Sequence, residues 1–381
     1  MKNDVKIEQL ENEISNERKR LSTDRLDISF GELISLYKNK ELIIRPEYQR
    51  LYRWTIKQKT ALIESILLSI PIPPIFVAED KNGVWELVDG LQRVSTFISF
   101  FGELASDVSN ISSQYYNVAA NDIDDEDEIH DDLMIGNKWA LESGALIKSL
   151  EGYNVDTLPL SLKINLKRAV CRVEILRGES NTTMKYELFK RLNSGGSKLT
   201  PQEIRNAVYR GINPRLNELI QELSKNSMFE ELTNLSEGRK QELYDQELVL
   251  RFIAFLNNAE RVNENTENYL NVFMENAVRD ESFDYNFYQN IFIQVLTLIY
   301  SIGDLNIFRN SRNLFVPVEF EGITIGIAQN FEKYQNNQTL LVERINQLKI
   351  DDYFKKYSGT ASNSKSRIKN RLLRANSIFS A

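Results

Sequence analysis

The 381-residue sequence contains only one cysteine and one histidine. Cys171 cannot form an intramolecular disulfide, and its apolar neighbours in "RAVCRVEIL" predict a buried, unreactive thiol. His130 lies in the acidic stretch "NDIDDEDEIHDD". With one thiol and one imidazole, the chain cannot build a zinc-thiolate cluster, a multi-histidine metal centre or the motif of an HNH nuclease.

The sequence also lacks an apolar run long enough to cross a bilayer. Its longest such run, "IFIQVLTLIYSIG", contains Gln294 and predicts a buried helix. The first twenty residues, "MKNDVKIEQLENEISNERKR", are charged throughout and do not have the apolar stretch of a signal peptide. We therefore expect a cytoplasmic protein with no membrane partner.

Net charge and hydrophobic content exclude fewer classes of protein than the scarcity of cysteine and histidine does. The formal net charge of -7 argues against a surface that grips nucleic acid on all sides, although a local basic groove would be compatible with it. A hydrophobic content of 42% is enough for a full core, and the length favours two lobes. We expect a globular chain.

Local patterns predict strands in the first half and helices in the second. "IFVAED" and "VWELVD" flank Asn82-Gly83, which is typical of a β-hairpin. The second strand reaches Asp89, where a helical pattern begins, so we expect Asp89 to be the N-cap of that helix with first-turn amides pointing outward. Beyond about residue 215 the apolar periodicity is helical throughout.

A second helix start is marked by "TPQE". Thr200 is suited to the N-cap, Pro201 to the first helical position and Glu203 to the third, which together predict a capping box. The preceding helical pattern ends at "NSGG".

Three stretches combine arginines with turn-forming or amide-bearing residues: "RPEYQRLYRW", "DGLQR" and "FKRLNSGGSKLTPQEIR". Guanidinium groups and directed amides suit a polyanion such as a nucleotide phosphate. The glycine pair does not have the spacing of a P-loop. Taken one at a time, the stretches also fit ordinary roles: a capped helix start, a helix C-cap and aromatic surface packing.

Taken together and in this order, the three stretches resemble the N-terminal domain family of GmrSD-type modification-dependent restriction proteins, and "YDQELVLRFIAF" resembles the helix that follows it. The resemblance implies an α+β fold. A charged leader (1–25) would precede a ParB/sulfiredoxin-like nucleotide-binding domain with a small mixed sheet (26–211). An α-helical lobe (212–381) with a basic C-terminal helix would follow.

The same resemblance implies nucleotide binding and hydrolysis coupled to DNA restriction or phage defence. Asp89, Gln92 and Arg93 would be catalytic, with Asp89 orienting Mg²⁺ or the attacking water and Arg93 neutralising charge on the phosphoryl group. Many members have glutamine in place of Leu91, so this chain has one polar contact fewer. The residues that would bind the nucleotide are Tyr48, Gln49, Arg50, Gly90, Arg191, Asn193, Gly195 and Gly196.

Two functions remain open at this stage. The first is an NTP-binding and NTP-hydrolysing sensor or regulatory subunit that acts with a separate nuclease or effector, because the single histidine excludes an HNH domain in this chain. The second is a non-enzymatic DNA-binding or adaptor module. The basic stretch "SNSKSRIKNRLLRANS" fits a helix that contacts phosphates or a partner, or a solvated terminal helix.

Overall fold

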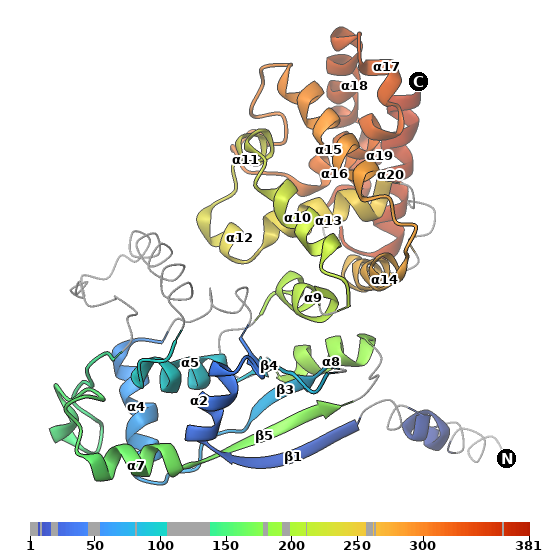
Figure 1. Ribbon diagram of the computed structural model, residues 1–381. Helices are drawn as coiled ribbons and strands as arrows, with labels where there is room; N and C mark the ends of the chain where they lie inside the picture. Colours follow the sequence, from blue (N-terminus) through green and yellow to red (C-terminus); the bar gives the residue numbers. More distant parts are fainter. Residues whose placement is uncertain are drawn as a thin grey trace. The chain divides into compact units, whose positions relative to one another are not determined.

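The computed structural model describes most of the chain, in the ranges 7, 10–16, 22–44, 54–80, 82–104, 138–177, 182–192, 199–210, 212–256, 262, 264–359 and 362–381, with only the backbone of 22, 182–185 and 192. The chain divides into two compact units, Met1–Lys198 and Leu199–Ala381 (Figure 1). Each unit is described by itself below.

The first unit contains a five-stranded mixed sheet in the order β1-β5-β3-β4-β2. The strands are β1 (Ser22–Ser29), β2 (Leu42–Ile43), β3 (Ile75–Glu79), β4 (Trp85–Asp89) and β5 (Val170–Arg177). β1 pairs with β5 and β3 with β4 in antiparallel fashion, whereas β3 and β5, and β2 and β4, are parallel. The small mixed sheet that the resemblance implied is thus confirmed.

The β3–β4 connection is the predicted hairpin. Gly83 adopts a left-handed φ of 81°, and the carboxylate of Asp80 accepts hydrogen bonds from the amides of Asn82 and Val84. An asparagine-glycine pair suits this turn because it tolerates positive φ. The prediction for Cys171 is also confirmed: the thiol is buried in β5, and burial raises its pKa to about 12.

β1 lies at an edge of the sheet, beside β5 (Figure 1). Charged side chains pair across the two strands: Arg25 Nε lies 3.0 Å from Glu174 Oε2, and Arg172 Nε lies 3.2 Å from Asp27 Oδ1. Leu26, between the two charged residues of β1, is 44% exposed. This edge of the sheet thus carries two ion pairs and one exposed apolar side chain.

Helices cover the sheet and share its apolar core. They are α2 (Phe30–Lys38), α4 (Ile56–Leu67), α5 (Leu91–Phe100), a short 3-10 helix (Lys148–Leu150), α7 (Leu160–Arg168) and α8 (Thr182–Leu192). The rings of Phe30 and Phe97 stack with centroids 4.3 Å apart, which joins α2 to α5. Tyr186 and Phe189 of α8 are buried.

A buried carboxylate fixes the irregular segment that precedes the 3-10 helix. Glu64 of α4 is only 4% exposed, and it accepts hydrogen bonds from the amides of Ala145, Leu146 and Ile147 at 3.2, 2.8 and 2.6 Å. The bond from Ile147 is the main reason that the pKa of Glu64 is lowered. This carboxylate ties α4 to a segment about eighty residues away in sequence.

The second unit is helical in its described residues. Its helices are α9 (Pro201–Arg210), α10 (Arg215–Ser224), α11 (Ser227–Thr233), α12 (Glu237–Gln241), α13 (Tyr244–Leu256), α14 (Thr266–Arg279), α15 (Tyr285–Tyr300), α16 (Pro317–Gln329), α17 (Phe331–Tyr334), α18 (Gln338–Ile350), α19 (Asp352–Ser358) and α20 (Lys365–Ser380). The expected α+β class with a helical C-terminal region is confirmed. No helix in the described ranges combines the length and apolar character needed to cross a membrane.

α9 begins with the predicted capping box. Thr200 N donates to Glu203 Oε2 at 2.6 Å, and Glu203 N donates back to Thr200 Oγ1 at 3.3 Å. Pro201 occupies the first helical position, where its missing N–H leaves no hydrogen bond unmade. The sequence pattern therefore placed this helix start correctly.

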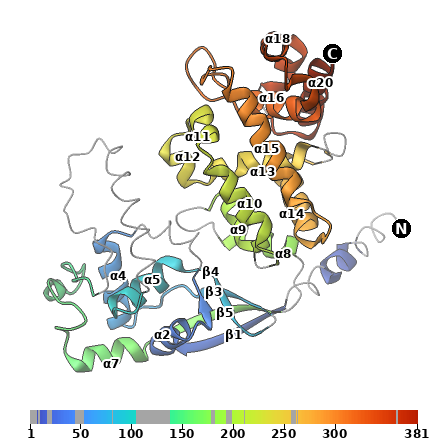
Figure 2. The same ribbon diagram turned by 45° about the horizontal axis from the view of Figure 1, so that its top comes forward.

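The basic C-terminal helix α20 is part of the core of this unit. α20 and α16 lie side by side in both views (Figures 1 and 2). Arg371 is fully buried and donates to Glu321 of α16, and Arg374 Nη2 lies 2.5 Å from Asp351 Oδ2. The alternative of a solvated terminal helix is thus wrong at Arg371, which is ion-paired in the core, whereas Arg374 pairs with Asp351 at a partly exposed position.

We predict that Glu64→Gln lowers the free energy of unfolding by about 1–3 kcal/mol, because the amides of Ala145, Leu146 and Ile147 lose a charged acceptor that is itself buried. The lowered pKa means that the carboxylate's contribution is fully present above its ordinary pKa of 4.5 and is lost as pH falls through the lower folded-state pKa. Urea denaturation of both proteins between pH 3 and 7 measures this. The exposed Glu151 gives the control, Glu151→Gln, and equal effects of the two substitutions would contradict the assignment.

Candidate functional site

The strand-to-helix turn at the end of β4 forms around Gly90. β4 ends at Asp89, α5 begins at Leu91, and Gly90 between them is the N-cap with φ 100° and ψ 14°. The prediction that Asp89 caps this helix is therefore wrong. The left-handed turn of Gly90 starts the helix one residue later, and among the described residues no side chain caps the first turn. The first hydrogen bond back to the cap runs from Val94 N to Gly90 O.

Two independent features require glycine at position 90. Its positive φ disfavours any residue with a side chain. A Cβ atom would also lie 2.6 Å from Cγ2 of Ile75, at the start of β3, and 3.2 Å from Nη2 of Arg93. The backbone at this turn therefore lies directly against the neighbouring strand, and the site is closed on that side.

Asp89 and Arg93 form an ion pair across this turn. Arg93 Nη2 lies 3.1 Å from Asp89 Oδ2 and donates to Pro74 O, also at 3.1 Å. The Arg93 side chain is 17% exposed and that of Asp89 is 41% exposed. Arg93 Nε is buried and has no hydrogen-bond partner among the described residues. The guanidinium is thus fixed at Nη2 by Asp89 and Pro74, and part of its surface is open to solvent.

Gln92 connects this turn with the first of the three motifs. Its Oε1 accepts a hydrogen bond from Trp54 N at 3.3 Å. Trp54 is the last residue of "RPEYQRLYRW", so the end of that stretch lies at the first turn of α5. The residues of the stretch that were predicted to bind nucleotide, Tyr48, Gln49 and Arg50, lie outside the described residues.

The third motif is described only in part. Arg191, near the end of α8, is 80% exposed and forms its ion pair with Glu187 at 4.0 Å. α8 packs against β4, so Arg191 belongs to the same unit as the Asp89 turn. The predicted residues Asn193, Gly195 and Gly196 lie outside the described residues.

The turn fits a metal ion that arrives with phosphates better than a resident metal. Among the described residues there is no group of three or more His, Cys, Asp or Glu side chains that could hold one. Asp89 provides one partly exposed carboxylate. Mg²⁺ is commonly held by one or two carboxylates together with substrate phosphates, so the donor set suits a nucleotide-bound Mg²⁺.

The residues that position this turn were not found from the sequence. Pro74 accepts from Arg93, Ile75 packs under Gly90, and Trp54 donates to Gln92. The sequence shows a proline at position 74 and an arginine-aromatic stretch that ends at Trp54. No local pattern, however, indicates that these two residues contact the Asp89 turn. The predicted hairpin was the one sequence signal for these contacts, because it places the start of β3, at Ile75, beside the end of β4, at Asp89.

We predict that Gly90→Ala is more destabilising than Gly83→Ala. Both positions have left-handed φ, which costs an alanine roughly 1–2 kcal/mol. Only at position 90 does the new methyl group overlap Ile75, which adds about 1–3 kcal/mol; a Cβ at Gly83 would have nothing within 4 Å. Thermal and urea unfolding of the two variants compare the costs, and equal values would show that the close approach to Ile75 is not a constraint.

Comparison with known protein families gives one match. Residues 30–210 match the family described as GmrSD restriction endonuclease, N-terminal domain. The match begins at α2, contains the Asp89 turn and ends with α9. Neither a curated protein nor a solved structure matches the chain. Residues 30–210 therefore belong to the N-terminal domain family of GmrSD restriction endonucleases, which indicates a component of a restriction or phage-defence system.

Proposed function

We propose that the chain binds a nucleoside triphosphate at the Asp89–Arg93 turn and hydrolyses it, as a sensor or regulatory subunit that acts with a separate nuclease or effector. The observation that carries this proposal is the Asp89–Arg93 ion pair at the uncapped start of α5. Family membership supports the restriction setting. The hydrolysis and the regulatory role are our inference.

Three features of the turn favour phosphate binding. The start of a helix carries a partial positive charge and unpaired amides, which attract anions. Gly90 lets the chain turn directly from β4 into α5, so the first-turn amides lie next to Asp89 and Arg93. Arg93 adds a guanidinium whose side chain is 17% exposed. A phosphate at this point would satisfy donors that the protein leaves available.

Asp89 and Arg93 have different roles in the proposed reaction. Asp89, the more exposed of the pair, orients the attacking water and receives its proton. Arg93 is held by Pro74 O and stabilises negative charge that develops on the phosphoryl oxygens. A Mg²⁺ ion bound to the nucleotide would neutralise phosphate charge, with Asp89 as its carboxylate contact from the protein. Gln92 keeps the segment that ends at Trp54 beside the turn.

Leu91 stands at the position where many members of the family have glutamine. Its side chain is partly buried and packs against the apolar core of the unit. The residue therefore contributes to packing at the position where many members carry an amide. We infer that the chain relies on Gln92 and Arg93 for polar contacts in this first turn.

The remaining nucleotide contacts stay predictions from the family motifs. They are Tyr48, Gln49, Arg50, Arg191, Asn193, Gly195 and Gly196.

We predict that Asp89→Asn lowers turnover far more than it weakens nucleotide binding. Phosphate release from each of the four ribonucleoside triphosphates, with Mg²⁺ and with or without DNA, should fall by about a hundredfold or more because the carboxylate no longer acts on the water. Asp156→Asn removes an exposed carboxylate of the same unit and serves as the control. Turnover that survives in Asp89→Asn would remove Asp89 from the mechanism.

We also predict that Arg93→Ala weakens binding itself. At millimolar nucleotide the wild type should show a rise in melting temperature, because a ligand that binds only the folded state stabilises it. The variant should lose most of this rise. Arg172→Ala, which removes an exposed arginine from β5, is the matched control. A wild type with no nucleotide-dependent rise, together with salt-sensitive DNA binding, would instead support the adaptor function.

A further inference from the structure

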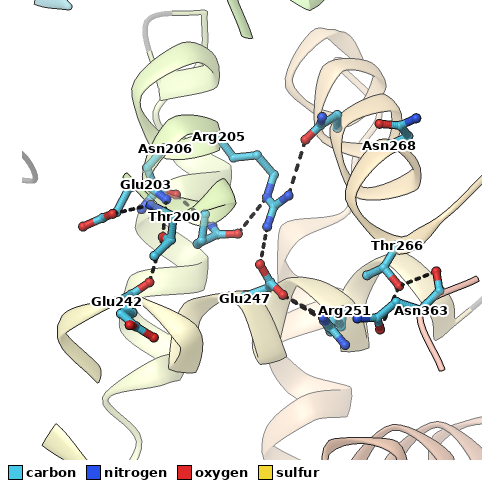
Figure 3. Close-up of polar contacts among 12 residues, drawn as sticks. Thr200, Glu203, Arg205, Asn206, Glu242, Glu247, Arg251, Thr266, Asn268 and Asn363 are labelled. Atoms are coloured by element: carbon cyan, nitrogen blue, oxygen red, sulfur yellow. Dashed lines mark hydrogen bonds and ion pairs between the residues drawn. The ribbon is translucent and has the colours of Figure 1, made fainter. Parts of the chain in front are cut away.

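A chain of buried charges runs through the helical unit. Arg205 of α9 and Arg251 of α13 both pair with Glu247, at 2.5 and 2.7 Å (Figure 3). Arg251 also pairs with Glu321 of α16 at 2.7 Å, and Arg371 of α20 pairs with the same carboxylate. Three guanidinium groups thus alternate with two carboxylates, which leaves one positive charge in excess.

Both carboxylates are ionised. Burial raises the pKa of Glu247, but Arg251 and Arg205 outweigh it and lower the pKa overall. Burial acts on Glu321 in the same way, and Arg371 and Arg251 again lower its pKa. All five groups of this cluster are therefore charged near neutral pH.

One end of this cluster borders a cavity of about 220 Å³. That volume is about seven times the share of one water molecule in the liquid, about 30 Å³, so it has room for a phosphate group and part of a larger ligand. The lining residues that matter for its chemistry are Arg205, Glu247, Arg251, Asn265, Glu267 and Asn363.

The two arginines have hydrogen-bond donors to spare. A guanidinium carries five N–H groups. Arg205 uses three of them, toward Gln202, Asn271 and Glu247. Arg251 also uses three, two toward Glu247 and one toward Glu321. Each guanidinium therefore has two N–H groups without a partner among the described residues.

The acceptors at the cavity are already engaged. Each oxygen of Glu247 accepts from an arginine. Asn265 Oδ1 caps α14 by accepting from Asn268 N at 2.9 Å, and Asn363 Oδ1 accepts from Thr266 Oγ1 at 3.2 Å. Both asparagine side chains thus use their oxygen and keep their NH₂ group as a donor. Figure 3 shows Thr266 and Asn363 beside Arg251.

We propose that this cavity binds a phosphate group, either as free inorganic phosphate or as part of a nucleotide. Its walls present the guanidinium of Arg251 and two amide NH₂ groups, with the charge of the fully buried Arg205 behind them, and an oxyanion is the ligand that accepts from such donors. The positive end of α14, which begins at Thr266, adds to this preference. Glu267 is the lining carboxylate that opposes an anion.

The test changes the charge at Asn265 without changing the cap. Aspartate caps a helix as well as asparagine does, so Asn265→Asp should leave the fold intact and put a negative charge in place of an NH₂ donor. We expect inorganic phosphate to bind this variant about tenfold or more weakly than the wild type, by calorimetric titration at constant ionic strength in chloride. Asn226→Asp makes the same change at the N-cap of α11 and should have no effect.

A second variant should change the phosphate affinity in the opposite direction. Glu267→Gln removes the opposing carboxylate and should tighten phosphate binding by about threefold to tenfold. Titration with a nucleoside monophosphate then distinguishes the sources, because tighter binding than inorganic phosphate indicates a nucleotide and equal binding indicates the free anion.

Three outcomes would overturn the inference: no phosphate binding to the wild type, equal affinity in Asn265→Asp and Asn226→Asp, or loss of the phosphate response in Arg93→Ala. The last would place the bound phosphate at the turn in the first unit. Conversely, Asn265→Asp should leave triphosphate turnover unchanged, so the two proposals can fail separately.

Discussion

The helical unit depends on the alternation of buried positive and negative groups that joins α9, α13, α16 and α20. Leaving one of these charges without its partner would cost on the order of 3–5 kcal/mol, because an ion cannot be rehydrated inside a packed core. Apolar contacts tolerate sliding, whereas guanidinium forks require their carboxylates at fixed distances. Glu247 and Glu321 therefore set the relative positions of four helices, including the one that follows the "NSGG" motif.

The sheet-containing unit depends on a backbone constraint instead. Gly90 lets β4 pass into α5 directly above Ile75, which brings the first-turn amides, Asp89 and Arg93 to one place. A larger residue would separate the strand end from the helix start. The chemistry that we propose thus relies on a residue that contributes no functional group, and the ion pair across the turn is a consequence of the backbone path.

The sequence was sufficient where a feature depends on neighbours in the chain. The hairpin at Asn82-Gly83, the capping box at Thr200 and the buried thiol of Cys171 follow from local chemistry, and they were predicted. The order of the three motifs was enough to identify the family, and with it the mixed sheet.

Features that join segments far apart in the chain could not be predicted from local sequence patterns. The Asp89 cap was predicted wrongly because the left-handed turn of Gly90, which lies against β3, starts the helix one residue later. Arg371 was counted with a basic surface although its partner, Glu321, is fifty residues away. A basic stretch of sequence has the same appearance whether its arginines meet solvent or a buried carboxylate, so only the tertiary structure separates the two cases.

The charged pairs on β1 have a consequence for the behaviour of the protein in concentrated solution. An eight-residue strand at the edge of a sheet is a template on which another chain can add a strand, and this is a common route to aggregation. Asp24, Arg25 and Asp27 place charges of both signs along this edge, and an incoming strand would have to accommodate them. The same side chains that pair with β5 thus discourage association between copies through their sheets.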